Sequence, residues 1–277
     1  MKCSFATLLR AAVVALACAG VAVPGIVRAQ DGKVEVLWLG QSATRIKTPT
    51  GKVIVIDPWL INNPSTPKEW KDLDALGKVD LVLVTHAHFD HLDKKTLRAV
   101  AAEQPIVVPE NVGNLVHGLG FNRVHELARW QSLEHEDVKV TLTPAHHWGA
   151  RMLHDSHRGF GGFLLEFGGR SILHCGDSAY APGIFPQIAD RADVEIALLP
   201  IGAYDAPTKR NVHMNPEEAL TAFEELRART MIPMHYGSFR LSYEPPNEPP
   251  TRLLERARQL GLLEKVHMLT EGQPVLF

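Results

Sequence analysis

The chain has 277 residues, of which 45% are hydrophobic, 22% charged and 7% aromatic, and its net charge is −2 with histidine neutral. This is the composition of an ordinary globular domain, so it excludes collagen-like, disordered and multi-span membrane proteins. Because 29 basic residues stand against 31 acidic ones, it also argues against a surface that follows nucleic-acid phosphates. Histidine, at 14 residues, is abundant.

The first 29 residues have the pattern of a secretory signal peptide. Lys2 and Arg10 precede an uncharged apolar run at 11–23, and small or aliphatic residues precede a cleavage site after Ala29. A membrane anchor is the weaker alternative, because the apolar run is shorter than a bilayer-spanning helix. A lipoprotein modified at Cys18 is another. We therefore expect an exported, periplasmic protein.

The expected mature chain, residues 30–277, is long enough to bury its own core. Its net charge would be −5, because three basic and no acidic residues leave with the signal peptide. It would keep one cysteine, Cys175, and hence no internal disulfide. It has no apolar run that would span a membrane.

The mature chain contains no repeat, low-complexity tract or linker, so a single domain is expected. Apolar runs predict strands at 34–39, 53–57, 81–85, 106–109, 138–142, 162–167, 171–174 and 195–200. Helices are predicted at 94–103, 216–228 and 250–260, the last after a proline-rich loop at 244–250. This order indicates a layered α/β or α+β domain.

The helix at 216–228 has the clearest start. Asn215 is its predicted N-cap, Pro216 suits the first helical position, and the two following glutamates favour the positive end of the helix dipole. Arg227 and Arg229 are expected at the negative end.

The strongest signal for chemistry follows the expected strand at 81–85. Four side chains that can bind a metal fall within six residues, His86-Ala87-His88-Phe89-Asp90-His91. In a looped segment His86 and His88 project the same way, whereas the later aspartate and histidine come after a turn and can reach a second ion. The pattern is rare by chance, so a solvated histidine-rich turn is the weaker interpretation.

Four ligands in one loop cannot complete two coordination shells, so others must come from elsewhere. Three segments qualify, each after an expected strand, and they contain His146-His147-Trp148, Asp177 and His235. Singly each is weak, because a buried histidine is more often a hydrogen-bonded core residue and a Gly-Asp pair is usually a turn. In this order and with the six-residue motif, they indicate a metal site.

With these residues the chain resembles the metallo-β-lactamase superfamily, in which a His-x-His-x-Asp-His loop, a third His, a bridging Asp and a last His occur in this order. The resemblance covers the whole mature chain. Local strings are similar to the N-acylphosphatidylethanolamine-hydrolysing phospholipase D group, at 143–148, 176–180, 199–204 and 214–219. The related ascorbate-phosphate lactonase-like branch shares the core ligands. His146 is a departure, because that group usually has Gln there.

The resemblance implies an α+β fold, a single-domain αββα sandwich of four layers with its site at the sheet edges. It assigns one metal ion to His86, His88 and His147. It assigns a second to Asp90, His91 and His235, with Asp177 bridging both. Imidazole and carboxylate ligands suit Zn²⁺, with Fe or Mn as alternatives. Cys175 is expected to pack rather than to bind metal.

The implied reaction is hydrolysis by a hydroxide that a pair of metal ions activates. Asp90 and Asp177 would be catalytic as well as ligands, Asp90 by orienting or deprotonating the water. The first hypothesis is a phosphodiesterase of the N-acylphosphatidylethanolamine phospholipase D-like type, acting on a lipid or other small-molecule substrate. The alternative is a lactonase or other carbonyl-ester hydrolase at the same site, with β-lactams the less favoured substrates.

Two further classes are disfavoured. A flavodiiron redox centre normally has Glu where His88 stands and also carries a flavin domain. A non-catalytic metal- or ligand-binding module is disfavoured because every ligand position is filled. No nucleic-acid partner is expected, and no oligomeric state is predicted.

Other residues are weaker candidates. In the stretch at 151–158, Arg151, His154 and Arg158 would meet a substrate phosphate, or else belong to a solvated loop. Tyr204 and His213 are candidates for lining the pocket.

Two hydroxyl residues, Thr85 and Ser178, are candidates for hydrogen bonds to the ligands, or else for local caps. The stretch Trp59-Leu60-Ile61 is predicted to be a core cluster rather than an apolar lip.

Overall fold

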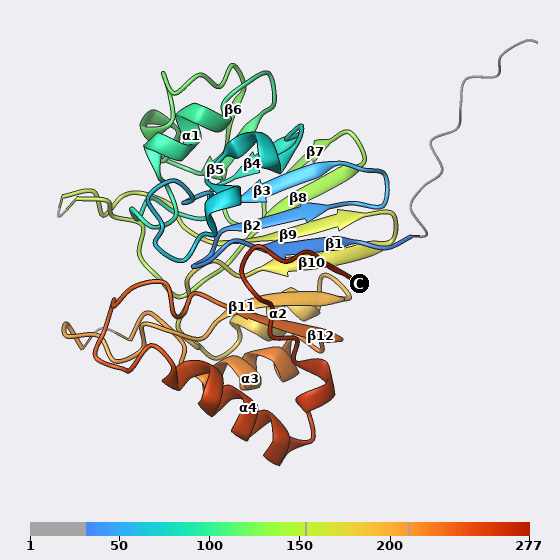
Figure 1. Cartoon of the computed structure of the whole chain (residues 1–277), viewed down its shortest axis with the longest axis vertical. Coiled ribbons are helices and arrows are strands. Elements are labelled where there is room, and N and C mark those ends of the chain that lie inside the picture. Colours follow the sequence, from blue (N-terminus) through green and yellow to red (C-terminus); the bar gives the residue numbers. More distant parts are fainter. Residues whose placement is uncertain (1–31, 153, 210) are drawn as a thin grey trace, which may run out of the picture.

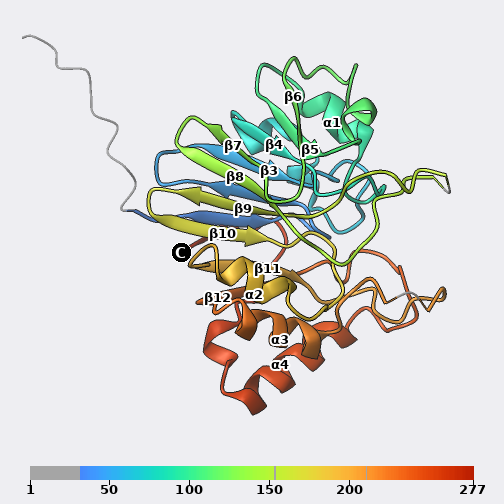
Figure 2. The same cartoon turned by 180° about the vertical axis from the view of Figure 1, so that it is seen from behind.

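The computed structural model describes residues 32–152, 154–209 and 211–277. The predicted signal peptide lies outside these residues. The described part forms two β-sheets that pack face to face, with helices on their outer sides (Figure 1, and Figure 2 from behind).

The first sheet has seven strands in the order β13-β1-β2-β3-β4-β5-β6. Its strands are β1 Glu35–Trp38, β2 Thr44–Lys47, β3 Val53–Ile56, β4 Leu81–Leu83, β5 Ile106–Pro109, β6 Val124–Leu127 and β13 Val275–Leu276. The strands from β13 to β3 pair antiparallel, and those from β3 to β6 pair parallel.

The second sheet has six strands in the order β12-β11-β10-β9-β8-β7. They are β7 Ser132–His135, β8 Val138–Thr143, β9 Gly162–Phe167, β10 Arg170–His174, β11 Ile196–Pro200 and β12 Thr230–Met234. The strands β10, β11 and β12 are parallel, whereas β7 to β10 form an antiparallel meander.

The core lies between the two sheets and also under the helices. Trp38 and Leu83 of the first sheet belong to one buried cluster with Phe163 and Leu165 of the second. Because side chains alternate along a strand, the residues on either side of Trp38, Leu37 and Leu39, pack on the opposite face. Fully burying such a side chain stabilises the fold by about 1.5–3 kcal/mol, and burial on both faces explains the nearly continuous apolar runs in the sequence.

Four α-helices cover the outer faces of the sandwich. They are α1 Lys94–Val100, α2 Ile184–Ala189, α3 Pro216–Glu225 and α4 Glu248–Leu260. Short 3₁₀ turns lie at Lys68–Trp70, Leu73–Leu76, Gly113–Leu115 and Leu263–Lys265. Leu97 of α1 packs on the first sheet, α3 packs against β11 of the second, and α4 packs on α3. The four-layer α+β sandwich is therefore confirmed.

Helix ends differ from the prediction. The helix expected to reach residue 228 ends at Glu225, because Arg227 adopts a positive φ of 54°. Arg227 and Arg229 pair instead with two exposed aspartates, Asp190 and Asp193. The first helix stops at Val100, three residues before the expected end.

The last helix starts at Glu248, within the predicted proline-rich loop. Pro249 and Pro250 lie in its first turn, where a missing N–H breaks no intrahelical bond.

Strands β2, β6, β7 and β13 and the helix α2 were not predicted from the sequence. Three of these strands carry polar residues over much of their length, and the fourth has two residues. Their positions are set by pairing with neighbouring strands, which local apolar patterning does not reveal.

Candidate metal centre

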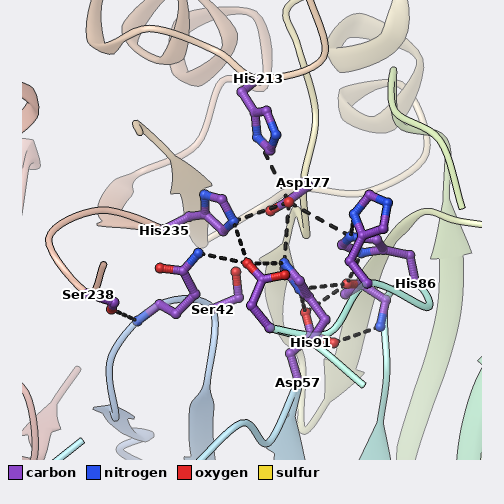
Figure 3. Close-up of polar contacts among 12 residues, drawn as sticks. Ser42, Asp57, His86, His91, Asp177, His213, His235 and Ser238 are labelled. Carbon is purple, nitrogen blue, oxygen red and sulfur yellow. Dashed lines mark hydrogen bonds and ion pairs between the residues drawn. The ribbon is translucent and has the colours of Figure 1, made fainter. Parts of the chain in front are cut away.

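The candidate ligands gather at one end of the sandwich, on the left of Figure 1. The six-residue motif follows β4, and His147, Asp177 and His235 follow β8, β10 and β12. Figure 3 shows four of these residues pointing toward one another from both sheets, namely His86, His91, Asp177 and His235. Each lies just beyond a strand whose pairing fixes its position, so the site is built by the sheets themselves.

The first group consists of His86, His88, His147 and Asp177, whose ligand atoms all lie within 4.8 Å of one another. Nδ1 of His88 lies 2.8 Å from Nε2 of His86 and 3.2 Å from Nε2 of His147. Three imidazole nitrogens thus converge on one point.

The second group consists of Asp90, His91 and His235, within the same limit. Oδ2 of Asp90 lies 3.6 Å from Nε2 of His91 and 3.5 Å from Nε2 of His235. The two histidine rings are stacked, with centroids 5.4 Å apart. The seven residues proposed from the sequence therefore come together as two adjacent groups.

Asp177 lies at the centre of both groups. Its Oδ2 is within 3.1–3.8 Å of one nitrogen on each of five imidazoles, those of His235, His91, His147, His86 and His213. The preceding Gly176 has a φ of 63°, and a Cβ there would come within 2.9 Å of Thr85. Glycine is therefore required for the turn that carries Asp177 into the site.

His213 is a possible metal ligand in addition to the seven residues proposed from the sequence. It comes from the loop between β11 and α3, and with Asp177 and His235 it forms a third group of possible ligands. Its ring stacks on that of His235 at 5.2 Å (Figure 3). The sequence marked it only as a pocket residue, because no neighbouring string supported it.

The residues present fit a metal centre. Among the described residues, Nε2 of His88, Nε2 of His91, both ring nitrogens of His235 and Oδ1 of Asp177 are buried without a hydrogen-bond partner. Leaving a buried polar atom unsatisfied costs about 1–3 kcal/mol. Divalent cations would satisfy Nε2 of His91 and Nε2 of His235, which face the carboxylates of the cluster. A set of imidazoles and carboxylates without thiolate is chemistry that suits Zn²⁺.

Charges in the cluster are strongly coupled. Burial alone would lower the pKa of His91, but Asp177, Asp90 and Asp57 raise it well above its usual value. Burial likewise opposes protonation of His235, whereas Asp177 and Asp90 raise its pKa to about 9. Burial would raise the pKa of Asp177, but His235 and His91 hold it well below its usual range. The carboxylates thus stay ionised and available to a cation.

The histidines of the first group are neutral, as ligands must be. Burial lowers the pKa of His86 and of His147 well below the usual value. Burial also lowers the pKa of His88, to about 4.

Asp57 is a supporting residue that the sequence did not reveal. It is fully buried after β3 and accepts hydrogen bonds from the backbone N–H and the hydroxyl of Thr85, both at 2.7 Å. Its Oδ2 is also 2.7 Å from Nδ1 of His91. A carboxylate acceptor on Nδ1 fixes the tautomer that leaves Nε2 free to bind metal.

Gln41, in the turn between β1 and β2, connects the two ends of the second group. Its side-chain amide donates to Oδ2 of Asp90 at 2.9 Å, and its backbone carbonyl accepts from the N–H of His235 at 2.9 Å. Its own N–H donates to Ser238 (Figure 3). Gln41 therefore fixes the positions of Asp90 and His235 relative to each other.

Backbone strain is concentrated here. Gln41, Asp57 and His235 are all buried and have φ values of 53°, 47° and 59°. Such conformations cost about 1–3 kcal/mol each for residues other than glycine and persist where surrounding structure imposes them.

The hydroxyl candidates behave differently. Thr85 Oγ1 lies 3.0 Å from Nδ1 of His86, so it contacts a candidate ligand. Ser178 instead accepts from the N–H of His146 and donates to the carbonyl of Ala179. It therefore positions the loop rather than a ligand side chain.

Two residues next to the ligands lie outside the cluster. The side chain of His146 is exposed and belongs to none of the ligand groups. Cys175 is buried in the core, where burial raises the pKa of its thiol. Because Cys175 belongs to none of the ligand groups, its side chain packs in the core, as the sequence predicted.

A cleft of about 710 Å³ opens beside the site. Its walls are mostly apolar, and Asp90, His88 and His213 lie among the residues that line it. Trp59 also lines it, edge-on to Phe239 at 5.2 Å. The prediction of a core cluster at 59–61 is therefore wrong for Trp59, which forms part of an apolar lip, whereas Leu60 is buried.

Of the five candidates for substrate contact or pocket lining, His213 lines this cleft and only one other does. Arg151 does, and its guanidinium also donates to the carbonyls of Ala87 and Leu92. Arg158 is buried and donates to Asp155, Asn111 and Asn114, so it anchors its loop.

His154 and Tyr204 also lie outside the cleft lining. The side chain of His154 is 81% exposed. The hydroxyl of Tyr204 donates to Glu248 of α4, and Arg252 stacks on its ring. The predictions for Arg158 and Tyr204 are corrected, because their polar groups bind the protein itself.

The fold and the buried His/Asp cluster define a metal-dependent hydrolase of the metallo-β-lactamase type. The beta-lactamase superfamily domain matches residues 52–236. A UPF0173 metal-dependent hydrolase of Polaromonas is 39% identical over 235 residues, which cover 78% of this chain and 82% of that protein. The chain belongs to the beta-lactamase superfamily.

Two further similarities are informative. The mitochondrial N-acyl-phosphatidylethanolamine-hydrolyzing phospholipase D of Saccharomyces cerevisiae is 32% identical over 87% of this chain and 55% of its own length. The solved structure of Igni18, a metallo hydrolase of Ignicoccus hospitalis, superposes with a TM-score of 0.72 at 26% identity, covering 88% of this chain and 98% of that one.

Proposed function

We propose that the protein is a dinuclear metallohydrolase that cleaves phosphodiesters. The observation that carries the proposal is the position of Asp177, whose carboxylate faces both ligand groups. His86, His88 and His147 would hold one ion, and Asp90, His91 and His235 the other. A pair of divalent ions supplies Lewis-acid activation of water and neutralises charge on the substrate oxygens.

The chain's own residues supply position and proton transfer. Asp90 lines the cleft and would orient the attacking water or accept its proton. His213 lines the same cleft and would contact the leaving-group oxygen or the phosphoryl oxygens. The carboxylate of Asp57 keeps His91 in the ligating tautomer.

A phosphodiester with an apolar substituent is the substrate class that we propose. The yeast relative is a phospholipase D that hydrolyses N-acyl-phosphatidylethanolamine, and the match covers 55% of the length of that protein. The apolar walls of the cleft suit an acyl or aryl group, while the metal centre at its base suits the charged phosphate.

The test combines metal content with a substrate panel. Purified protein loaded with Zn²⁺ is expected to bind two ions per chain and to hydrolyse bis(p-nitrophenyl) phosphate and N-acylphosphatidylethanolamine. Asp177→Asn should lose both the second ion and the activity. Hydrolysis of lactones but of neither diester would establish the carbonyl-ester alternative, and a single bound ion would overturn the dinuclear site.

A further inference from the structure

Large exposed apolar side chains are concentrated around one opening of the molecule. Eight described residues of this kind are exposed, and six of them surround the cleft. We call these six the apolar rim: Phe89 (61% exposed), Trp148 (37%), Met152 (55%), Phe239 (38%), Leu241 (39%) and Tyr243 (60%). The other two, Leu260 and Leu276, lie on α4 and β13.

The rim is formed by loops from different parts of the chain. Four of its members line the cleft directly. Met152 follows Arg151, a cleft residue, and the N–H of Tyr243 donates to Asp205, next to the cleft-lining Ala206. The loops around residues 150 and 208 project furthest from this end of the sandwich in Figures 1 and 2.

Two of the rim side chains, Phe89 and Phe239, are held in place by contacts with neighbouring residues. The guanidinium of Arg151 lies 4.1 Å from the ring centroid of Phe89 and is itself tied to two backbone carbonyls. Phe239 packs edge-on against Trp59. Fixed apolar side chains that remain in water around a cleft indicate a surface that meets an apolar phase or partner.

Cations flank the rim. Arg151 lies over the ring of Phe89, and burial together with Arg151, Arg98 and Arg158 lowers the pKa of Lys94 at the start of α1. Arg240 lies between two rim residues in sequence and is exposed, as is Lys209. Asp93, Asp155, Asp205 and Glu244 are the acidic residues near the rim, and Arg158, which pairs with Asp155, is a further cation. The chain as a whole has a net charge of −2, so this basic excess is local.

Exposed aromatic residues with a basic border match the interface of an anionic bilayer. Trp and Tyr favour the headgroup level, apolar side chains enter the acyl boundary, and Lys and Arg interact with anionic headgroups. No helix in the described residues is long and apolar enough to cross a membrane. Contact with a bilayer through this part of the chain would therefore be peripheral.

We propose that the apolar rim docks on the surface of an anionic lipid bilayer, so that the cleft opens toward the membrane. Docking itself is independent of catalysis. The consequence that a lipid enters the cleft from the bilayer rests on the proposed function.

The test is vesicle flotation with matched double variants. The protein is expressed with its own leader and purified as the processed form, which would contain every strand and helix described above. It is mixed with vesicles of phosphatidylcholine alone or of phosphatidylcholine with phosphatidylglycerol. We expect the wild type to float with the anionic vesicles and to bind neutral vesicles more weakly.

Met152→Ser/Tyr243→Ser removes two rim side chains that do not line the cleft. It should lower the partition coefficient roughly tenfold or more, because each side chain contributes apolar burial in the bilayer. The control Leu260→Ser/Leu276→Ser removes the two exposed apolar side chains outside the rim and should bind as the wild type does. Thermal melting of both variants verifies that they are folded.

The outcomes separate docking from catalysis. Equal binding by both double variants, or no binding by the wild type, would overturn the proposal. So would a wild-type dimer in solution that the rim variant converts to a monomer, since the rim would then be a contact between copies. Docking without hydrolysis of any diester would support the proposal of membrane docking and contradict the proposed phosphodiesterase function.

Discussion

The residues around the candidate metal centre show how hydrogen bonds and ion pairs position a buried cluster of charged side chains. Asp177 is the common neighbour of five imidazoles. Asp57 forms a hydrogen bond with the candidate ligand His91, and Gln41 forms one with the candidate ligand Asp90. Asp57 accepts three hydrogen bonds at 2.7 Å, two from Thr85 and one from His91. Its carboxylate therefore holds both ends of the six-residue ligand motif.

Asp57→Asn tests this role. The amide has one acceptor oxygen, so its NH₂ group would face a donor that the carboxylate now satisfies. Metal affinity is expected to fall about 10–100-fold, as for other residues that support ligands, measured by competition with a chromophoric chelator.

Asp80→Asn is the matched control, because Asp80 also accepts a backbone N–H, that of Val53, yet lies at the opposite end of β3. It should leave metal affinity unchanged. Equal affinity of Asp57→Asn and the wild type would show that His91 is held without this carboxylate.

The elements that carry the site are short, and their ends are fixed by specific contacts. The loop of His213 leads into α3, whose first turn has a complete capping box. Asn215 accepts from the N–H of Glu218, and the Glu218 side chain accepts from the N–H of Asn215. Two orphan donors are thus satisfied reciprocally, which fixes where the His213 loop ends and the helix begins.

Asn215→Ala removes this cap. The expected loss is about 1 kcal/mol in the free energy of unfolding, measured by urea denaturation. Glu224→Ala, at an exposed position within the same helix, is the control and should change stability by less than about 0.5 kcal/mol. A loss no larger than that of the control would mean that packing alone fixes the start of α3.

At the scale of the whole molecule, the sandwich brings both sheets' strand ends to one edge. His86 and His91 come from the first sheet and His147, Asp177 and His235 from the second. A bound cation would therefore connect the two layers. Without one, buried nitrogens and a carboxylate oxygen remain unsatisfied at the seam between them.

Chelation should consequently destabilise the fold. Ions present at about a thousandfold over their dissociation constant stabilise by about 4 kcal/mol, so removing them should lower the melting temperature by roughly 10 °C for a domain of this size. Differential scanning calorimetry with and without chelator measures this, and added Zn²⁺ should reverse it. The melting temperature of Asp177→Asn, which would keep one ion, should fall less on chelation than that of the wild type; an equal fall would place the stabilising ions away from Asp177.

The sequence by itself determined the fold class and the candidate ligands. Buried strands appear as apolar runs, and metal-binding side chains at strand ends are conspicuous when four fall within six residues. Local helix chemistry at Asn215 was equally plain. These features depend on neighbours along the chain, so they can be recognised before the chain is folded.

Tertiary structure alone decided the surroundings of the site. Asp57 and Gln41 act on residues 34 and 49 positions away, so no local pattern marks them. Arg158 was a plausible phosphate contact and Tyr204 a plausible pocket residue until packing gave their polar groups internal partners. The apolar rim joins loops far apart in sequence, because exposure depends on what the folded chain leaves uncovered.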